Sequence, residues 1–158
     1  MSKPRDQQTG LEHVRGFLTG ELPPSPVGVM MGWRYVAVDD GRAQLDLDPG
    51  PHLYNKDGTV HGGILATLLD ATMWAAITTR LGVGVRSVTV DLKVSYVAAP
   101  GPGAGTLSAH ASAISVRRTL AIAEGRLVGP DGKLYCHATG TFSVLHPRAP
   151  KAGVAHPA

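Results

Sequence analysis

The amino-acid sequence predicts an α+β domain in which an antiparallel sheet curls around one long helix. One long segment is apolar and nearly free of glycine and proline, whereas six other segments have the composition or the alternation of strands. Four of these six follow one another without an intervening helix, which is typical of antiparallel pairing. The chain is 158 residues long, the length of a single domain.

The first half of the chain supplies a short helix, a hairpin and the long helix. Residues 10–20 place apolar side chains at helical spacing, and the ELPPSP that follows ends this helix because proline lacks an amide donor. Residues 27–38 are predicted to be extended, and the turn DDG joins them to the alternating residues 42–48. The long helix is predicted over residues 61–80.

The second half supplies four strands in a meander. The first is predicted over residues 86–97, with one face formed by Val88, Val90, Leu92, Val94 and Tyr96. The other three are predicted over residues 106–116, 118–128 and 134–145. A single domain is therefore expected over residues 10–146, between flexible segments at residues 1–9 and 147–158.

Composition and charge narrow the functional classes. The net charge of +3 is spread along the chain and no nucleic-acid motif is present, so we expect no nucleic-acid partner. No apolar run is long enough to cross a bilayer, and the start MSKPRDQQTG lacks the apolar core of a signal peptide. The single cysteine, Cys136, cannot form an internal disulfide. These features predict a cytoplasmic protein without a membrane partner.

A lone carboxylate, Asp70, interrupts the long apolar helix. Its face of the helix carries no other charge and consists of Ala66, Thr67, Met73, Trp74 and Ile77. Ionised carboxylates are rarely buried without a partner, and aspartate is a poor residue for a helix interior. Asp70 is therefore either structural, on a solvated stripe or hydrogen-bonded to Thr67, or functional.

The sequence HGG at the start of this helix supplies a second feature. The backbone N–H groups of Gly62 and Gly63 have no acceptor within the helix and lie at the positive end of its dipole. Because glycine has no side chain, a ligand can approach this backbone closely. Such N–H groups can stabilise a carbonyl oxygen that becomes negative during acyl transfer, although a glycine pair also serves a plain turn.

The spacing of the two features predicts how they cooperate. Gly62 and Asp70 are eight residues apart, which is roughly 12 Å along a helix, so one carbonyl group cannot touch both within a chain. If both act on one substrate, two antiparallel copies of the helix must meet across a two-fold axis. A functional Asp70 therefore predicts a homodimer with two composite sites.

The segment from Asn55 to Asp70 has the pattern N-x-x-G-x-V-H-G-G-x-L-x-x-L-x-D. This pattern closely resembles the signature of hotdog-fold thioesterases, particularly the phenylacetate-pathway (PaaI-like) branch. The resemblance covers residues 10–146 and includes the segments SVTVDLKVSYVAAP and RRTLAIAEGRL. It implies a hotdog fold, hydrolysis of acyl-CoA thioesters without a further cofactor, and a homodimer or homotetramer.

The resemblance also implies roles for individual residues. Asp70 is expected to act as the nucleophile or as the general base for water, and the N–H of Gly62 to polarise the thioester carbonyl. Asn55 is expected to hold the carbonyl or the water, and Thr89 to orient the water. His61 is expected to organise the loop or the helix entry rather than to act as a base.

Further residues are candidates for substrate binding. Arg117 and Arg118 resemble the family's nucleotide-contacting region and would meet the phosphates of coenzyme A, although solvated surface charge explains them equally well. Gly63 would let the substrate approach the backbone at the helix start. Met73 and Trp74 would shape the acyl pocket, although methionine and tryptophan at helical spacing are also typical of a core. The acyl group is expected to be aryl or of medium chain length. The seven histidines show no metal-binding spacing, so we expect no metal site.

Two other functions fit parts of the sequence. A hydratase or dehydratase of the same fold would act on hydroxyacyl thioesters with a paired histidine and acidic residue, in sequence contexts unlike VHGG. A non-catalytic acyl-CoA-binding protein would keep the pocket but would not need Asp70.

Overall fold

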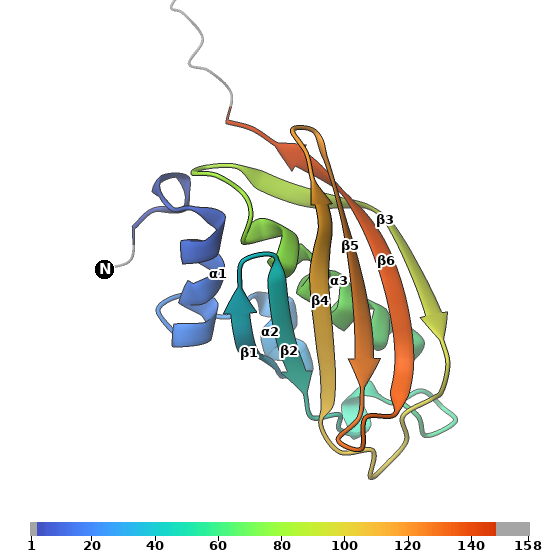
Figure 1. Ribbon diagram of the computed structural model, residues 1–158. Coiled ribbons are helices and arrows are strands. Elements are labelled where there is room, and N and C mark those ends of the chain that lie inside the picture. Colours follow the sequence, from blue (N-terminus) through green and yellow to red (C-terminus); the bar gives the residue numbers. More distant parts are fainter. Residues whose placement is uncertain (1–2, 148–158) are drawn as a thin grey trace, which may run out of the picture.

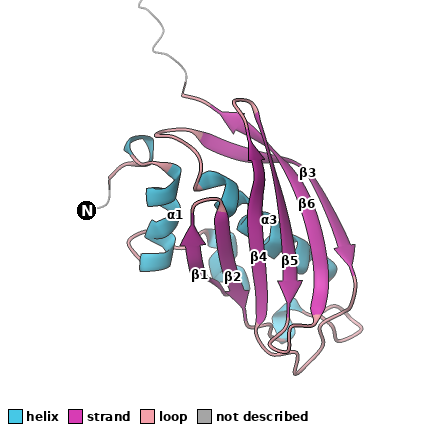
Figure 2. Ribbon diagram, in the orientation of Figure 1, coloured by secondary structure: helices cyan, strands magenta, loops and turns pink. Residues whose placement is uncertain are grey.

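A six-stranded antiparallel sheet wraps around one long helix in the computed structural model, which describes residues 3–147 (Figure 1). The strand order is β1-β2-β4-β5-β6-β3. The strands are β1 (Trp33–Asp39), β2 (Arg42–Leu47), β3 (Arg86–Tyr96), β4 (Leu107–Val116), β5 (Leu120–Val128) and β6 (Leu134–Leu145). The helices are α1 (Gly10–Thr19), α2 (Pro26–Met31) and α3 (Gly62–Thr78), with short 3-10 turns η1 (Arg5–Gln7) and η2 (Pro51–Leu53). Figure 2 shows the helices gathered on one side of the sheet, so the predicted α+β class is confirmed.

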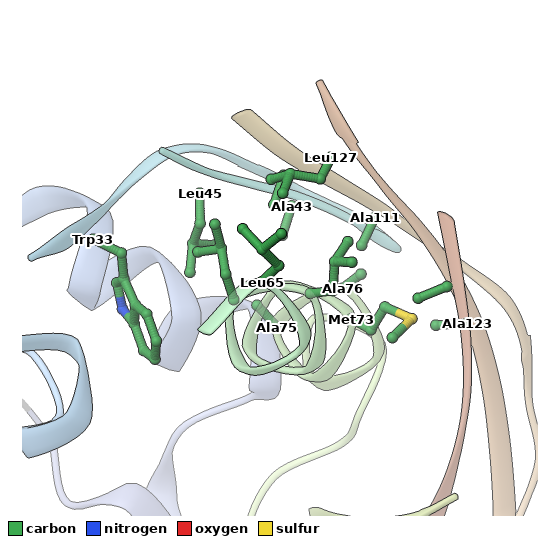
Figure 3. Close-up of a cluster of buried hydrophobic side chains, with 14 of the residues drawn as sticks. Trp33, Ala43, Leu45, Leu65, Met73, Ala75, Ala76, Ala111, Ala123 and Leu127 are labelled. Carbon is green, nitrogen blue, oxygen red and sulfur yellow. The ribbon is translucent and has the colours of Figure 1, made fainter. Parts of the chain in front are cut away.

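The sheet covers α3 because this helix is apolar on almost all sides. Its fully buried side chains include Leu68, Leu69, Met73 and Ile77, and each such leucine, isoleucine or methionine stabilises the fold by about 1.5–3 kcal/mol. Small residues on the strands let the helix approach closely, since a Cβ added to Gly125 would lie 3.2 Å from Leu69. Figure 3, in which α3 is seen end-on, shows Met73 and Ala76 directed at the strands.

Strand β3 forms a free edge of the sheet, and a bulge changes its alternation. The pairing with β6 shifts between Thr89 and Asp91, so Val90 is an extra residue. Thr89 pairs with the buried Phe142 and therefore faces α3, whereas Val88 and Val90 are 49% and 63% exposed. The prediction of one continuous apolar face from Val88 to Tyr96 is wrong, because the bulge shifts the phase of the strand by one residue.

The extended conformation predicted for residues 27–31 is also wrong, because local capping favours the helix α2. The Ser25 side chain accepts a hydrogen bond from the Gly28 N–H at 3.2 Å. Pro26 occupies the first helical position, where its missing N–H costs nothing. Gly32, in the left-handed conformation with φ 79°, ends the helix just before β1.

Helix α1 packs against the end of α3 through a glycine. A capping box between Thr9 and Glu12 starts the helix, and the Gly10 N–H donates to the Leu81 carbonyl at 2.9 Å. A Cβ on Gly10 would lie only 1.6 Å from the Thr78 carbonyl oxygen. No residue with a side chain fits at this crossing of α1 and α3. Helix α1 also packs against β1, beside which it lies in Figure 1.

The domain boundaries at residues 10 and 146 stay predictions. Ahead of the first boundary, the Arg5 guanidinium donates to the Val85 carbonyl at 2.9 Å. Beyond the second boundary only Pro147 is described, so the rest of the tail lies outside the described residues. Among residues 3–147, no helix is both long and apolar enough to cross a membrane.

Candidate active site

Asp70 lies midway along α3 and is half-buried at a cavity next to the start of β3. The Thr89 hydroxyl donates to Asp70 Oδ1 at 2.9 Å. Burial raises the pKa of the Asp70 carboxyl above its usual range, and the hydrogen bond from Thr89 opposes this shift. Thr67 is not its partner, because the Thr67 hydroxyl donates to the Gly63 carbonyl at 2.8 Å. A carboxylate with one donor and an otherwise apolar surrounding is suited to act as a nucleophile or base.

Aromatic side chains line the cavity beside Asp70, which has a volume of about 430 Å³. Of the eight aromatic residues in the chain, four line this cavity: Phe17, Trp33, Tyr35 and Trp74. Phe17 and Tyr35 stack with their centroids 5.4 Å apart, and burial raises the pKa of Tyr35 to about 12. The cavity is therefore suited to a flat or apolar acyl group.

His13 supports this aromatic wall from α1. Its ring meets Phe17 edge-on at 5.0 Å and Trp74 at 6.4 Å, and its Nδ1 lies 3.0 Å from Oε1 of the buried Gln8. Burial and, secondarily, the Arg5 charge lower the pKa of His13 to about 4. The His13 ring is therefore uncharged near neutral pH, and it packs against the aromatic wall rather than acting as a proton donor.

A second cavity, of about 370 Å³, lies at the start of α3 and includes Gly62, Asn55 and Tyr96. His61 caps the helix, because its Nδ1 accepts the Gly63 N–H at 3.0 Å. The Gly63 N–H, which has no acceptor within the helix, is therefore capped by the His61 side chain. The Gly62 N–H has no hydrogen-bond acceptor within residues 3–147. Of the two glycine N–H groups, the one of Gly62 is therefore without a partner in the described part of the chain, and Gly62 lines this cavity.

The Asn55 side chain organises the loop that leads into the helix. Its Oδ1 accepts the N–H groups of Asp57 and Thr59 at 2.9 and 3.2 Å, and its Nδ2 donates to the Thr59 hydroxyl at 3.0 Å. This Asx-type turn holds the loop against the helix start. Asn55 is thereby fixed in the same cavity wall as Gly62.

Of the other site residues predicted from the sequence, some line a cavity and others lie elsewhere in the molecule. Trp74 lines the Asp70 cavity. Met73 lies instead in the core, with its side chain 3.2 Å from the position of a Cβ on Gly140. Arg117 and Arg118 are exposed in the turn between β4 and β5 and line neither cavity. Within residues 3–147, no three histidine, cysteine or acidic side chains are grouped to hold a metal ion.

The two cavities flank opposite ends of β3 and share no residue. Thr89 and Val88 line the first cavity near the start of the strand, and Tyr96 lines the second at its end. Within one chain, Asp70 and Gly62 therefore serve separate cavities, as their spacing along the helix predicts.

Sequence comparison places the chain among thioesterases. A family model described as "Thioesterase superfamily" matches residues 57–136. A Pseudomonas aeruginosa protein is 30% identical over 80% of this chain and 86% of its own length. A Halobacterium salinarum protein is 38% identical over 58% of this chain, and the match spans 62% of that relative's length. The names of both relatives assign them to the esterases only provisionally.

Solved structures share the fold of this chain. A Ralstonia eutropha protein related to phenylacetic acid degradation is 29% identical, with a TM-score of 0.74 over 82% of this chain and 98% of that one. The Escherichia coli PaaI protein is 16% identical with a TM-score of 0.76, covering 86% and 96% of the two chains. A Streptococcus pneumoniae structure described as a hypothetical thioesterase protein with coenzyme A is 22% identical with a TM-score of 0.66, covering 74% and 88%. The chain therefore belongs to the thioesterase superfamily and is a hotdog-fold enzyme of that family, as the pattern from Asn55 to Asp70 predicts.

Proposed function

We propose that this enzyme hydrolyses acyl-CoA thioesters with Asp70 as the catalytic carboxylate. The observation that carries the proposal is the position of Asp70, held by Thr89 at the wall of an aromatic cavity. The carboxylate either attacks the thioester carbonyl or removes a proton from the attacking water. In both cases the C–S bond breaks, water supplies the hydroxyl of the free acid, and the CoA thiolate leaves.

The oxyanion donor in this proposal is the Gly62 N–H of a second chain. Strand β3 is an eleven-residue edge strand, and exposed edges of this length are templates for pairing with another strand. Antiparallel pairing of two β3 strands about a two-fold axis near Asp91 would set the start of one strand beside the end of the other. The Asp70 cavity of one chain would then adjoin the Gly62 cavity of the second.

The proposed substrate is an aryl-CoA or a medium-chain acyl-CoA. The aromatic cavity supports an aryl or medium-chain acyl group. The coenzyme A in the similar Streptococcus structure supports coenzyme A as the thiol that carries this group. In this proposal, Arg117 and Arg118 meet the CoA phosphates from the turn where they lie exposed. A tetramer of two such dimers and cytoplasmic residence stay predictions.

A mixing experiment tests the composite site. Asp70→Asn removes the carboxylate, and Gly62→Pro removes the N–H at the first helical position, where proline is compatible with the helix. Each variant alone should release almost no thiol from acyl-CoA. A co-expressed mixture should recover about one quarter of wild-type activity, because half of the randomly paired dimers contain one intact site.

The matched control is Gly62→Ala, which keeps the N–H and adds the same Cβ. No recovery on mixing, with both single variants inactive, would place both groups in one chain's site. Thiol release unaffected by Asp70→Asn would contradict the carboxylate mechanism. Loss of the enoyl-thioester absorbance without thiol release would instead identify a hydratase, and acyl-CoA binding without turnover a binding protein.

A further inference from the structure

The hydroxyl of Tyr96 makes a contact with the helix start that the catalytic proposal does not use. Tyr96 is the last residue of β3, and its Oη donates to the Gly62 carbonyl oxygen at 2.9 Å. The ring lies directly over the glycine, since a Cβ on Gly62 would meet ring atoms Cε1 and Cζ at 3.3 and 3.4 Å. The bulge in β3 sets the phase that brings this phenol to the helix start, and a Cβ on Gly62 would ask the ring to shift by only a few tenths of an ångström.

Three hydrogen bonds hold the backbone at the start of α3. His61 Nδ1 accepts the Gly63 N–H at 3.0 Å, and the His61 carbonyl accepts the Ile64 N–H at 2.9 Å. Tyr96 holds the carbonyl of Gly62 itself. The carbonyls of His61 and Gly62 are thus both held, while the Gly62 N–H has no acceptor within residues 3–147 and Gly62 lines the cavity.

We propose that Tyr96 is a positioning residue for thioester hydrolysis, which aims the Gly62 N–H at the developing oxyanion by anchoring the Gly62 carbonyl to the end of β3. This inference rests on the proposed function. The Gly62 carbonyl belongs to the Gly62–Gly63 peptide, and holding it limits rotation about Gly62 and so of the adjoining His61–Gly62 peptide, which carries the N–H. Hydrogen bonds to an oxyanion depend steeply on donor placement, so a small rotation of that N–H lowers the rate of the chemical step. Binding of the substrate in the ground state depends on it much less.

The test is Tyr96→Phe, which keeps the ring and removes only the hydroxyl. We expect kcat for acyl-CoA hydrolysis to fall about fivefold to tenfold, as for the loss of one net hydrogen bond, with KM changed less than twofold. The control is Tyr135→Phe, because the Tyr135 hydroxyl forms no hydrogen bond within residues 3–147 and lines neither cavity. This control should keep the wild-type kcat.

A double-mutant cycle separates positioning from general stability. If Tyr96 acts through the Gly62 N–H, adding Tyr96→Phe to Gly62→Pro should cause no further loss of kcat. A full additional loss in the Gly62→Pro background, or an unchanged kcat in Tyr96→Phe alone, would overturn the inference. A Gly62→Pro enzyme with full activity would instead defeat the oxyanion role in the proposed function. An inactive Gly62→Pro beside a fully active Tyr96→Phe would defeat only the role of Tyr96.

Discussion

Asp70 is a carboxyl group whose ionisation is set by two opposing contacts. Burial in the aromatic cavity raises its pKa, and the hydrogen bond from Thr89 lowers it. Because only the ionised form can attack or accept a proton, the acid limb of the pH–rate profile should follow this pKa. In the proposed mechanism, Thr89 therefore extends the range of pH over which Asp70 can act.

Removing the Thr89 hydroxyl should shift this acid limb. In Thr89→Val the opposing contact is lost, so the pKa of Asp70 rises further and activity disappears at a higher pH as the solution is acidified. The measurement is kcat/KM against pH, which reports groups of the free enzyme. Thr89→Ser keeps a hydroxyl and should leave the midpoint unchanged. An acid limb at the same pH in all three enzymes would mean that another group sets it.

Bulges, caps and glycines decide where the elements of this fold start and what they face. The sequence predicts all six strands and α3, because their alternation and apolar composition are strong. It does not reveal the bulge at Val90, since an inserted residue leaves the alternation of letters intact and changes only the pairing with β6. It also misses α2, where the Ser25 cap overrides the extended preference of its valines.

The crossing of α1 and α3 gives an element-scale prediction. Gly10→Ala should destabilise the protein by more than about 2 kcal/mol, because the added Cβ would overlap the Thr78 carbonyl oxygen. The measurement is urea unfolding at one fixed protein concentration, since association contributes to stability. Gly101→Ala is the matched control, because a Cβ there meets no atom within 4 Å. Equal midpoints for both variants would mean that α1 moves aside at no cost.

At the scale of the whole molecule, the aromatic cavity beside Asp70 forms where α1, β1 and α3 meet. Sequence patterns predict Asp70, Gly62, Thr89 and Trp74 as candidates because they lie in or near one family motif or on one helix. Phe17 and Tyr35 come from other elements, and their shared cavity appears only once the chain is folded. Tyr96 is found at Gly62 for the same reason, 34 positions away along the chain.

The aromatic wall predicts which acyl groups are preferred. Across a panel of aryl, short, medium and long acyl-CoAs, thiol release should be fastest with the aryl or the medium-chain esters. Trp74→Ala should lower kcat/KM for the preferred ester about tenfold, the effect of losing one buried aromatic contact of roughly 1.5 kcal/mol. Its effect on acetyl-CoA should be small, because a two-carbon acyl group does not reach the wall. A uniform loss across the panel would contradict a role in acyl selection.

The cavity beside Asp70 is built from two parts of the chain. The residues proposed for the chemistry, Gly62, Asp70 and Thr89, all fall inside the stretch 57–136 that matches the family model. Five residues of the cavity wall precede that stretch: Phe17, Ser25, Val27, Trp33 and Tyr35. Substitutions in the first part of the chain can therefore change the shape of this cavity without touching Gly62, Asp70 or Thr89.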